Sequence, residues 1–120
     1  MEKEKWMKEA LKEAKKAFEI DEVPVGCVIV QDGKIIARGH NLREKTSDPT
    51  AHAEIVAIRK ATKKLSSWRL ENCDVYVTIE PCSMCAGALL WCRVRSITYG
   101  AKEPKGGALG SSYHLFEQPN

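Results

Sequence analysis

The chain has 120 residues, of which 43% are hydrophobic and 29% charged, and its formal net charge is +3 at pH 7. This length supports one domain with a hydrophobic core, and the composition excludes a disordered, fibrous or membrane-spanning class. The longest apolar run, residues 86–92, is too short to cross a bilayer, and the charged N-terminal segment does not resemble a signal peptide. We therefore expect a single domain, residues 1–120, in the cytoplasm and without a membrane partner.

The first half of the chain predicts a helix, a hairpin and a second helix. Apolar residues recur at helical spacing over residues 3–20, which indicates an amphipathic surface helix. Residues 25–31 and 34–39 are predicted strands joined by a turn at Asp32-Gly33, and residues 40–50 are a predicted polar loop. The segment Asp48-Pro49-Thr50 favours the start of a helix that runs to about residue 65.

The second half alternates strand and helix. Residues 75–79 and 96–99 are predicted strands, and residues 82–92 are a predicted helix between them. The chain then becomes rich in glycine, with at most a short helix near residues 113–117. Alternation of this kind implies parallel neighbouring strands with helices on both faces. We therefore predict an α/β fold, a three-layer α/β/α domain around a mixed sheet of about four strands.

Two short motifs carry the chemistry. His52-Ala53-Glu54 offers an imidazole and a carboxylate, and Pro81-Cys82-Ser83-Met84-Cys85 offers two thiols. Ligands of an open α/β sheet bind beyond the carboxyl ends of the strands, near helix N-termini, which is where both motifs fall. Three ligands from His52, Cys82 and Cys85 leave the fourth position of a tetrahedral zinc open for water. Glu54 is then the group that moves protons for that water.

The other histidines and cysteines bear on whether the site stays open. Cys92 lies roughly 10 Å beyond Cys85 along a helix, which is too far for it to join the site. Cys73 precedes the strand that leads to Cys82, so it is expected at the opposite end of the sheet. The spacing leaves three further residues open as ligands: Cys27, His40 and His114.

Each motif has a simpler interpretation when taken alone. A single Cys-x-x-Cys pair also occurs in redox-active sites, and a Glu in the first turn of a helix is often an exposed carboxylate. Cys27, Cys73 and Cys92 are predicted core residues, as are the three tryptophans of the chain. His52 and Glu54 are two residues apart and do not share a face of a regular helix. We therefore expect the metal to lie beyond the helix end, where side chains of the first turn converge.

The motifs in this order resemble those of the cytidine deaminase-like superfamily, whose zinc nucleobase deaminases carry H-x-E followed by P-C-x-x-C. Within it, the chain resembles the bacterial tRNA-specific adenosine deaminases. The residues that carry this second resemblance are Val23-Pro24-Val25-Gly26, His40-Asn41, Tyr99-Gly100-Ala101 and Pro104-Lys105-Gly106-Gly107.

The resemblance implies a function and a set of roles. His52, Cys82 and Cys85 would bind one Zn²⁺ per chain, and Glu54 would transfer protons. Asn41 would contact the target base, while Glu103, where these enzymes usually have Asp, and Lys105 are further candidate substrate contacts. The implied reaction is hydrolytic deamination of adenosine to inosine at the wobble position of the tRNA anticodon stem-loop, by a homodimer. The family pattern continues with another strand and a C-terminal helix, so we expect a C-terminally short domain. Its sheet would have four strands where the family normally has five. The last strand would then be an unpaired edge strand, which favours association with another chain.

Two other functions remain open on the sequence. The zinc motif fits a deaminase of a free base or nucleoside, of the guanine or cytosine type, equally well. A catalytically silent, zinc-stabilised subunit that binds RNA or pairs with a longer partner is the third hypothesis, and Glu54 argues against it because a purely structural site needs no proton shuttle.

Overall fold

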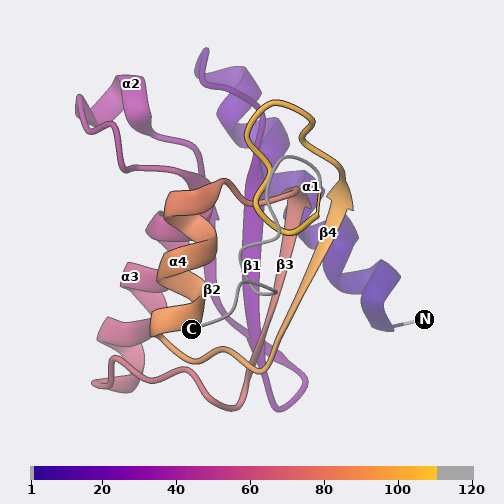
Figure 1. Ribbon diagram of the computed structural model, residues 1–120, viewed down its shortest axis with the longest axis vertical. Coiled ribbons are helices and arrows are strands. Elements are labelled where there is room, and N and C mark those ends of the chain that lie inside the picture. The colour runs from indigo at the N-terminus through magenta and orange to yellow at the C-terminus, as the bar shows by residue number, and fades with distance from the viewer. Residues whose placement is uncertain (1, 111–120) are drawn as a thin grey trace.

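The computed structural model describes residues 2–110, and the elements follow the predicted order with one addition (Figure 1). The predicted short helix near residues 113–117 and His114 lie outside the described residues. The helices and strands are α1 (Glu2–Glu19), β1 (Gly26–Gln31), β2 (Lys34–His40), α2 (Arg43–Thr46), α3 (Ala53–Leu65), β3 (Cys73–Ile79), α4 (Ser83–Trp91) and β4 (Ser96–Ala101).

The described strands form one mixed sheet in the order β2-β1-β3-β4. Strand β1 is antiparallel to both β2 and β3, and β4 is parallel to β3. Strands β2 and β3 therefore run in the same direction, and α3 connects them across β1. The hairpin turn has positive φ at Asp32 and Gly33 (51° and 74°), the conformation of a type I′ turn. The mixed four-stranded sheet predicted from the sequence is confirmed.

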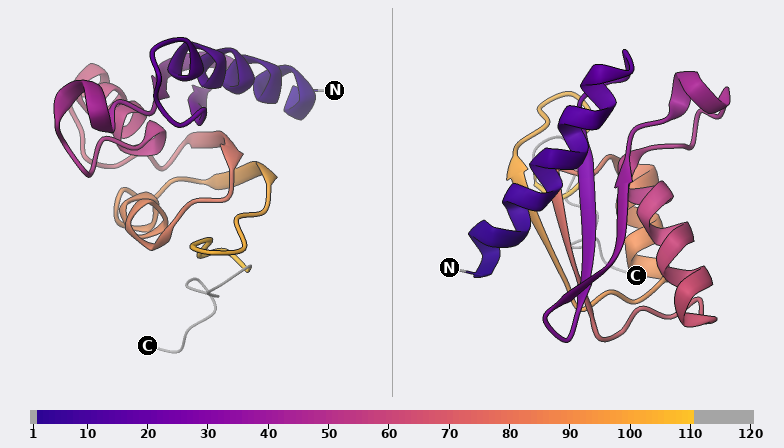
Figure 2. Two further views of the ribbon diagram at one scale, coloured as in Figure 1. Left: turned by 90° about the horizontal axis from the view of Figure 1, so that it is seen from above. Right: turned by 180° about the vertical axis from the view of Figure 1, so that it is seen from behind.

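Both faces of the sheet are covered, which confirms the predicted three layers. Cys27 and Ile29 of β1 pack in one core with α3 and α4, whereas Val28 and Val30 pack in the other core with Trp6 and Ala10 of α1. Figure 2 shows α1 crossing one side of the strands, with α3 and α4 on the other. No helix within residues 2–110 combines the length and hydrophobicity that a membrane crossing requires.

The start of α3 differs from the prediction. Asp48 does not cap this helix; its Oδ1 accepts hydrogen bonds from the backbone N–H and the hydroxyl of Thr50, at 2.9 and 2.7 Å. This local turn, together with the short helix α2 in the predicted loop, delays the helix until Ala53. His52 consequently occupies the N-cap position instead of the first helical turn.

The predictions for the cysteines and tryptophans have mixed outcomes. Cys27, Cys73 and Cys92 are all in the core shared by α3 and α4, as predicted. Trp6 is also buried, but Trp68 and Trp91 are 56% and 73% exposed, so the core prediction is wrong for these two. Trp68 has the guanidinium groups of Arg69 and Arg93 over its ring, at 4.9 and 6.0 Å from the centroid, and this contact needs an accessible face.

A glycine determines how closely α3 approaches the sheet. A Cβ atom on Gly39 of β2 would lie 2.4 Å from the carbonyl oxygen of Ala53 and 2.7 Å from the backbone nitrogen of Ala57. These atoms belong to the helix backbone and cannot move independently of it. The missing side chain at Gly39 therefore lets the first turn of α3 lie directly against the strand.

We expect Gly39→Ala to lower the free energy of unfolding by about 1–3 kcal/mol, because the added methyl group overpacks the contact between β2 and α3. Urea denaturation followed by circular dichroism measures this change. Gly87→Ala is the matched control, since a Cβ there meets nothing within 4 Å and removes a helix glycine. That variant should be more stable by about 0.5–1 kcal/mol. Equal effects of the two substitutions would contradict the steric explanation.

Candidate metal centre

The two predicted motifs lie at the starts of two helices. His52 is the N-cap of α3 and Cys82 is the N-cap of α4, and both have extended backbone conformations. Neither side chain makes a capping hydrogen bond, so both project away from their helices. Cys85 follows in the first turn of α4. The difficulty posed by the spacing of His52 and Glu54 disappears, because His52 lies just outside the helix.

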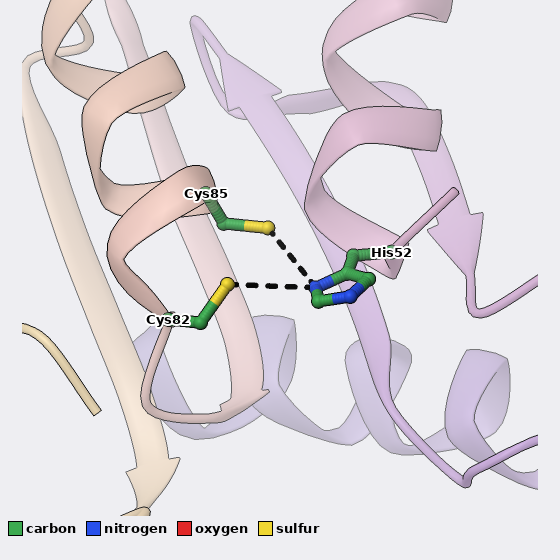
Figure 3. Close-up of side chains that lie close together, drawn as sticks. All are labelled: His52, Cys82 and Cys85. Atoms are coloured by element: carbon green, nitrogen blue, oxygen red, sulfur yellow. Dashed lines mark hydrogen bonds between the residues drawn. The ribbon is translucent and has the colours of Figure 1, made fainter. Parts of the chain in front are cut away.

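The three ligand-type side chains converge on one point (Figure 3). His52 Nδ1 lies 3.6 Å from Cys82 Sγ and 3.5 Å from Cys85 Sγ, and the three ligand atoms are all within 4.8 Å of one another. A tetrahedral zinc bound to nitrogen at about 2.05 Å and sulfur at about 2.3 Å separates those two atoms by about 3.6 Å. The donor set and its spacing therefore fit one Zn²⁺.

The titration behaviour of these side chains suits metal binding. The hydrogen bond with Cys85 is the largest of the effects that lower the pKa of Cys82 to about 3. The same contact, together with burial, raises the pKa of Cys85, and the hydrogen bond with Cys82 raises the pKa of His52. The cluster therefore holds protons that a metal ion displaces when it binds.

No fourth histidine, cysteine or acidic side chain joins this group within residues 2–110. Cys27, which the spacing left open, is fully buried in the core, and His40 Nδ1 lies 3.1 Å from Glu13 Oε1. Cys73 and Cys92 belong to the same core as Cys27. The described residues thus supply three ligands, the number found in catalytic zinc sites that keep one position open.

Glu54 is a buried carboxyl beside the ligand group. It is the second residue of α3, its exposed fraction is 4%, and burial raises its pKa to about 7. A carboxyl group with a pKa near neutrality both accepts and donates a proton readily. Glu54 therefore has the properties of a general acid and base.

A pocket of about 160 Å³ opens beside the ligands. Its apolar wall comes from Val23, Val25 and Ile79, and its polar lining includes Asn41 and Glu103 together with His52, Glu54 and Cys82. Pockets for drug-sized ligands measure roughly 300–1,000 Å³, so this pocket suits a smaller group on the scale of one base. The structure thus brings Asn41 and Glu103 to the site. Lys105 is exposed and not part of the lining, although its backbone N–H donates to Glu103 Oε1 at 3.0 Å.

Asn41 presents a defined part of its side chain to the pocket. Its Oδ1 accepts a hydrogen bond from the backbone N–H of Arg43 at 3.2 Å, and the residue is buried. The amide NH₂ is therefore the group that Asn41 can offer to an acceptor on a ligand.

Two further pocket residues were missed at the level of sequence. Glu80 is buried and accepts hydrogen bonds from the backbone N–H groups of Glu103 and Leu109, at 3.2 and 2.8 Å, so it ties the segment after β4 to the end of β3. Its position between a strand and the Pro81-Cys82 motif was the only available signal. Arg43 also lines the pocket; within the predicted polar loop of residues 40–50, only Asn41 was predicted as a site residue.

Comparison with known proteins now places the chain in a family. Residues 1–101 match the family model described as the cytidine and deoxycytidylate deaminase zinc-binding region. The chain belongs to this family. The match covers both motifs and therefore agrees with one Zn²⁺ per chain held at a His/Cys/Cys group.

The relatives are more specific. The tRNA-specific adenosine deaminase of Bacillus subtilis is 53% identical over 96% of this chain and 71% of its own length, and that of Aquifex aeolicus is 46% identical over 99% and 79%. A structure from studies of A-to-I editing by tRNA:A34 deaminases superposes with a TM-score of 0.96 at 49% identity, covering 100% of this chain and 92% of that one. Guanine deaminase from B. subtilis superposes with a TM-score of 0.83 at 39% identity, covering 97% of this chain and 77% of that one.

We expect Cys85→Ser to weaken zinc binding by more than about 100-fold, because it removes a sulfur ligand and not merely an outer-shell contact. Zinc content of the purified protein and competition with a chromogenic chelator measure the change. Cys92→Ala is the control, since this thiol lies in the core and away from the ligand group. Retention of zinc by the Cys85 variant, or its loss from the Cys92 variant, would contradict the proposed ligand set.

Proposed function

We propose that the protein is a zinc-dependent hydrolase that converts adenosine to inosine at the wobble position of the tRNA anticodon. The observation that carries this proposal is a His/Cys/Cys group at tetrahedral spacing beside a buried carboxyl, in a pocket on the scale of one base. Family membership supports the chemistry, and relatives named tRNA-specific adenosine deaminases support the substrate.

In this proposal His52 Nδ1, Cys82 Sγ and Cys85 Sγ are the metal ligands. Zinc held there would act as a Lewis acid and make a water molecule acidic enough to give up a proton near neutral pH. Glu54 accepts a proton from water while the water oxygen forms a bond to C6 of adenine; the C6=N1 double bond opens, and Glu54 passes this proton to N1. Glu54 then moves the hydroxyl proton to the amino group, so that the C6–N6 bond breaks, C6=O forms and ammonia leaves. Adenosine and water thus give inosine and ammonia.

The remaining pocket residues hold the substrate. Val23, Val25 and Ile79 form an apolar wall against the plane of the base, and the Asn41 amide NH₂ donates to an acceptor on its edge. Glu103 lines the same pocket, and we assign to its carboxylate a hydrogen bond from the sugar. Because the pocket is small, an adenosine in RNA would have to leave its stack to enter it.

We also propose that the protein binds RNA as a homodimer and acts in the cytoplasm, where such a tRNA substrate is found. Met84, Leu90 and Trp91 expose apolar surface on α4, and β4 is an edge strand of the described sheet. Surfaces of both kinds favour association with another chain. They support a dimer, and sedimentation of the purified protein tests it.

We expect Glu54→Gln to lower kcat for inosine formation by at least about 10²–10⁴-fold, because it removes the proton acceptor while keeping the shape of the side chain. Mass spectrometry of nucleosides from tRNA incubated with the variant measures the product. Zinc content should remain that of the unmodified protein, since Glu54 lies outside the ligand group. Undiminished inosine formation would refute the assigned role.

Deamination of a free base is the second candidate, and the likeness to B. subtilis guanine deaminase favours it over other small-molecule reactions. The purified protein should be assayed on an anticodon stem-loop, guanine and cytidine at equal concentrations. We expect ammonia release and inosine from the stem-loop. Activity on guanine or cytidine alone would replace the proposed substrate, and no activity in a zinc-loaded protein that melts on chelation would favour the silent-subunit hypothesis.

A further inference from the structure

Arg43 differs from the other arginines of residues 2–110 in its surroundings. Its guanidinium has no carboxylate within ion-pair distance and no aromatic ring in contact among those residues, and the polar side-chain atom beside it is His52 Nε2, at 3.5 Å from Nη1. The remaining arginines have acidic or aromatic partners: Arg38 with Glu9 and Glu13, Arg59 with Asp48, Arg69 with Glu71, Arg93 with Trp68, and Arg95 with Asp74.

The contact between Arg43 and His52 joins two donors. His52 turns Nδ1 toward the two sulfurs, so in the metal-bound imidazole the hydrogen is on Nε2. A guanidinium has N–H donors and no acceptor. The two groups therefore cannot hydrogen-bond to each other. Both residues line the base pocket, where an acceptor can take a hydrogen bond from each of them. A histidine that binds a metal almost always donates its second N–H to such an acceptor.

The backbone of Arg43 is held at the mouth of the pocket. Its own N–H donates to Asn41 Oδ1 at 3.2 Å, and the next two N–H groups, of Glu44 and Lys45, donate to the carboxylate of Glu22 at 3.1 and 2.7 Å. Glu22 is buried, so this carboxylate anchors α2 against the rest of the domain. The guanidinium is thus carried by a turn that is fixed at both of its ends.

A second cavity adjoins the base pocket at Arg43. Its volume is about 550 Å³, and it shares Val23, Asn41 and Arg43 with the base pocket. Lys45 adds a second cation to its lining, and the acidic groups that face it are Asp21, Glu22 and Glu44. The Glu22 carboxylate is already engaged by backbone N–H groups. Arg43 therefore stands at the boundary between the space for a base and a wider space beside it.

We propose that Arg43 and the Nε2–H of His52 together bind a phosphate oxygen of the substrate, at the point where the nucleotide backbone leaves the base pocket. This inference rests on the proposed function. An arginine matches phosphate because its planar fork donates two parallel hydrogen bonds. The phosphate could belong to RNA or to a free nucleotide; we assign it to an RNA phosphodiester, because the adjoining cavity gives a continuing chain room beside Arg43. The contact would position the target adenosine without taking part in bond breaking.

The test is the salt dependence of RNA binding by Arg43→Gln. Fluorescence anisotropy with a labelled anticodon stem-loop gives the dissociation constant over a series of salt concentrations. Loss of one phosphate contact should weaken binding by about 5- to 10-fold at low salt and reduce the slope of log K against log[salt] by about 0.7–0.9. Arg69→Gln is the matched control, because it removes the same charge at an exposed position in the connection between α3 and β3 and should leave the slope unchanged.

Further measurements separate this contact from a structural role. The zinc content of Arg43→Gln should equal that of the unmodified protein, and KM for the stem-loop should rise by a larger factor than kcat falls. If the unmodified protein binds the stem-loop and Arg43→Gln leaves the salt slope unchanged, the inferred phosphate contact is wrong while the proposed function stands. A selective loss of affinity for AMP over adenosine, with stem-loop binding intact, assigns the phosphate to a free nucleotide and overturns the RNA assignment. Failure of the unmodified protein to bind or deaminate the stem-loop overturns the proposed function and this inference together.

Discussion

The site depends on the meeting of two helix starts at one end of the sheet. Helices α3 and α4 both begin beside the carboxyl end of β3, and their N-cap residues are His52 and Cys82. N-cap positions normally carry side chains that satisfy the first backbone N–H groups of a helix. Here both N-cap side chains face the space between the helices instead. The stabilisation that a capping residue gives, about 1 kcal/mol per helix, is thus exchanged for a metal-binding geometry.

Metal binding can offset this loss and the cost of the groups buried nearby. Two cysteine sulfurs, an imidazole and the Glu54 carboxyl lie close together at the pocket, and burial raises the pKa of Glu54 to about 7. A divalent ion that binds only the folded chain stabilises it by mass action. The same ion makes it favourable for Cys85 to lose the proton that burial and the contact with Cys82 hold on its thiol. The stability of the fold and the chemistry of the site therefore both depend on metal binding by His52, Cys82 and Cys85.

The sequence predicted the parts of this arrangement that follow from periodicity and spacing. The order of helices and strands, the hairpin turn and the two motifs were readable because each depends on neighbours in the chain. The start of α3 was not, because an Asp-Pro-Thr segment can cap a helix or form a local turn, and here Asp48 forms the turn with Thr50. The exposure of Trp68 and Trp91 could not be predicted from the sequence either, because the identity of a large apolar residue does not show whether it faces the core or the solvent.

The rim of the pocket was the hardest part to predict, and its construction explains why. Its two loops are organised by buried carboxylates that accept backbone N–H groups: Glu22 holds Glu44 and Lys45, and Glu80 holds Glu103 and Leu109. In each case the carboxylate and its backbone donor lie more than 20 residues apart in the sequence. Every residue type except proline has a backbone N–H, so no sequence pattern identifies the donor. The helix starts thus present the metal ligands, whereas these two carboxylates hold the loops that carry the pocket residues Arg43 and Glu103. A change at Glu22 or Glu80 would therefore act on the shape of the pocket lining through backbone hydrogen bonds that lie outside the ligand group.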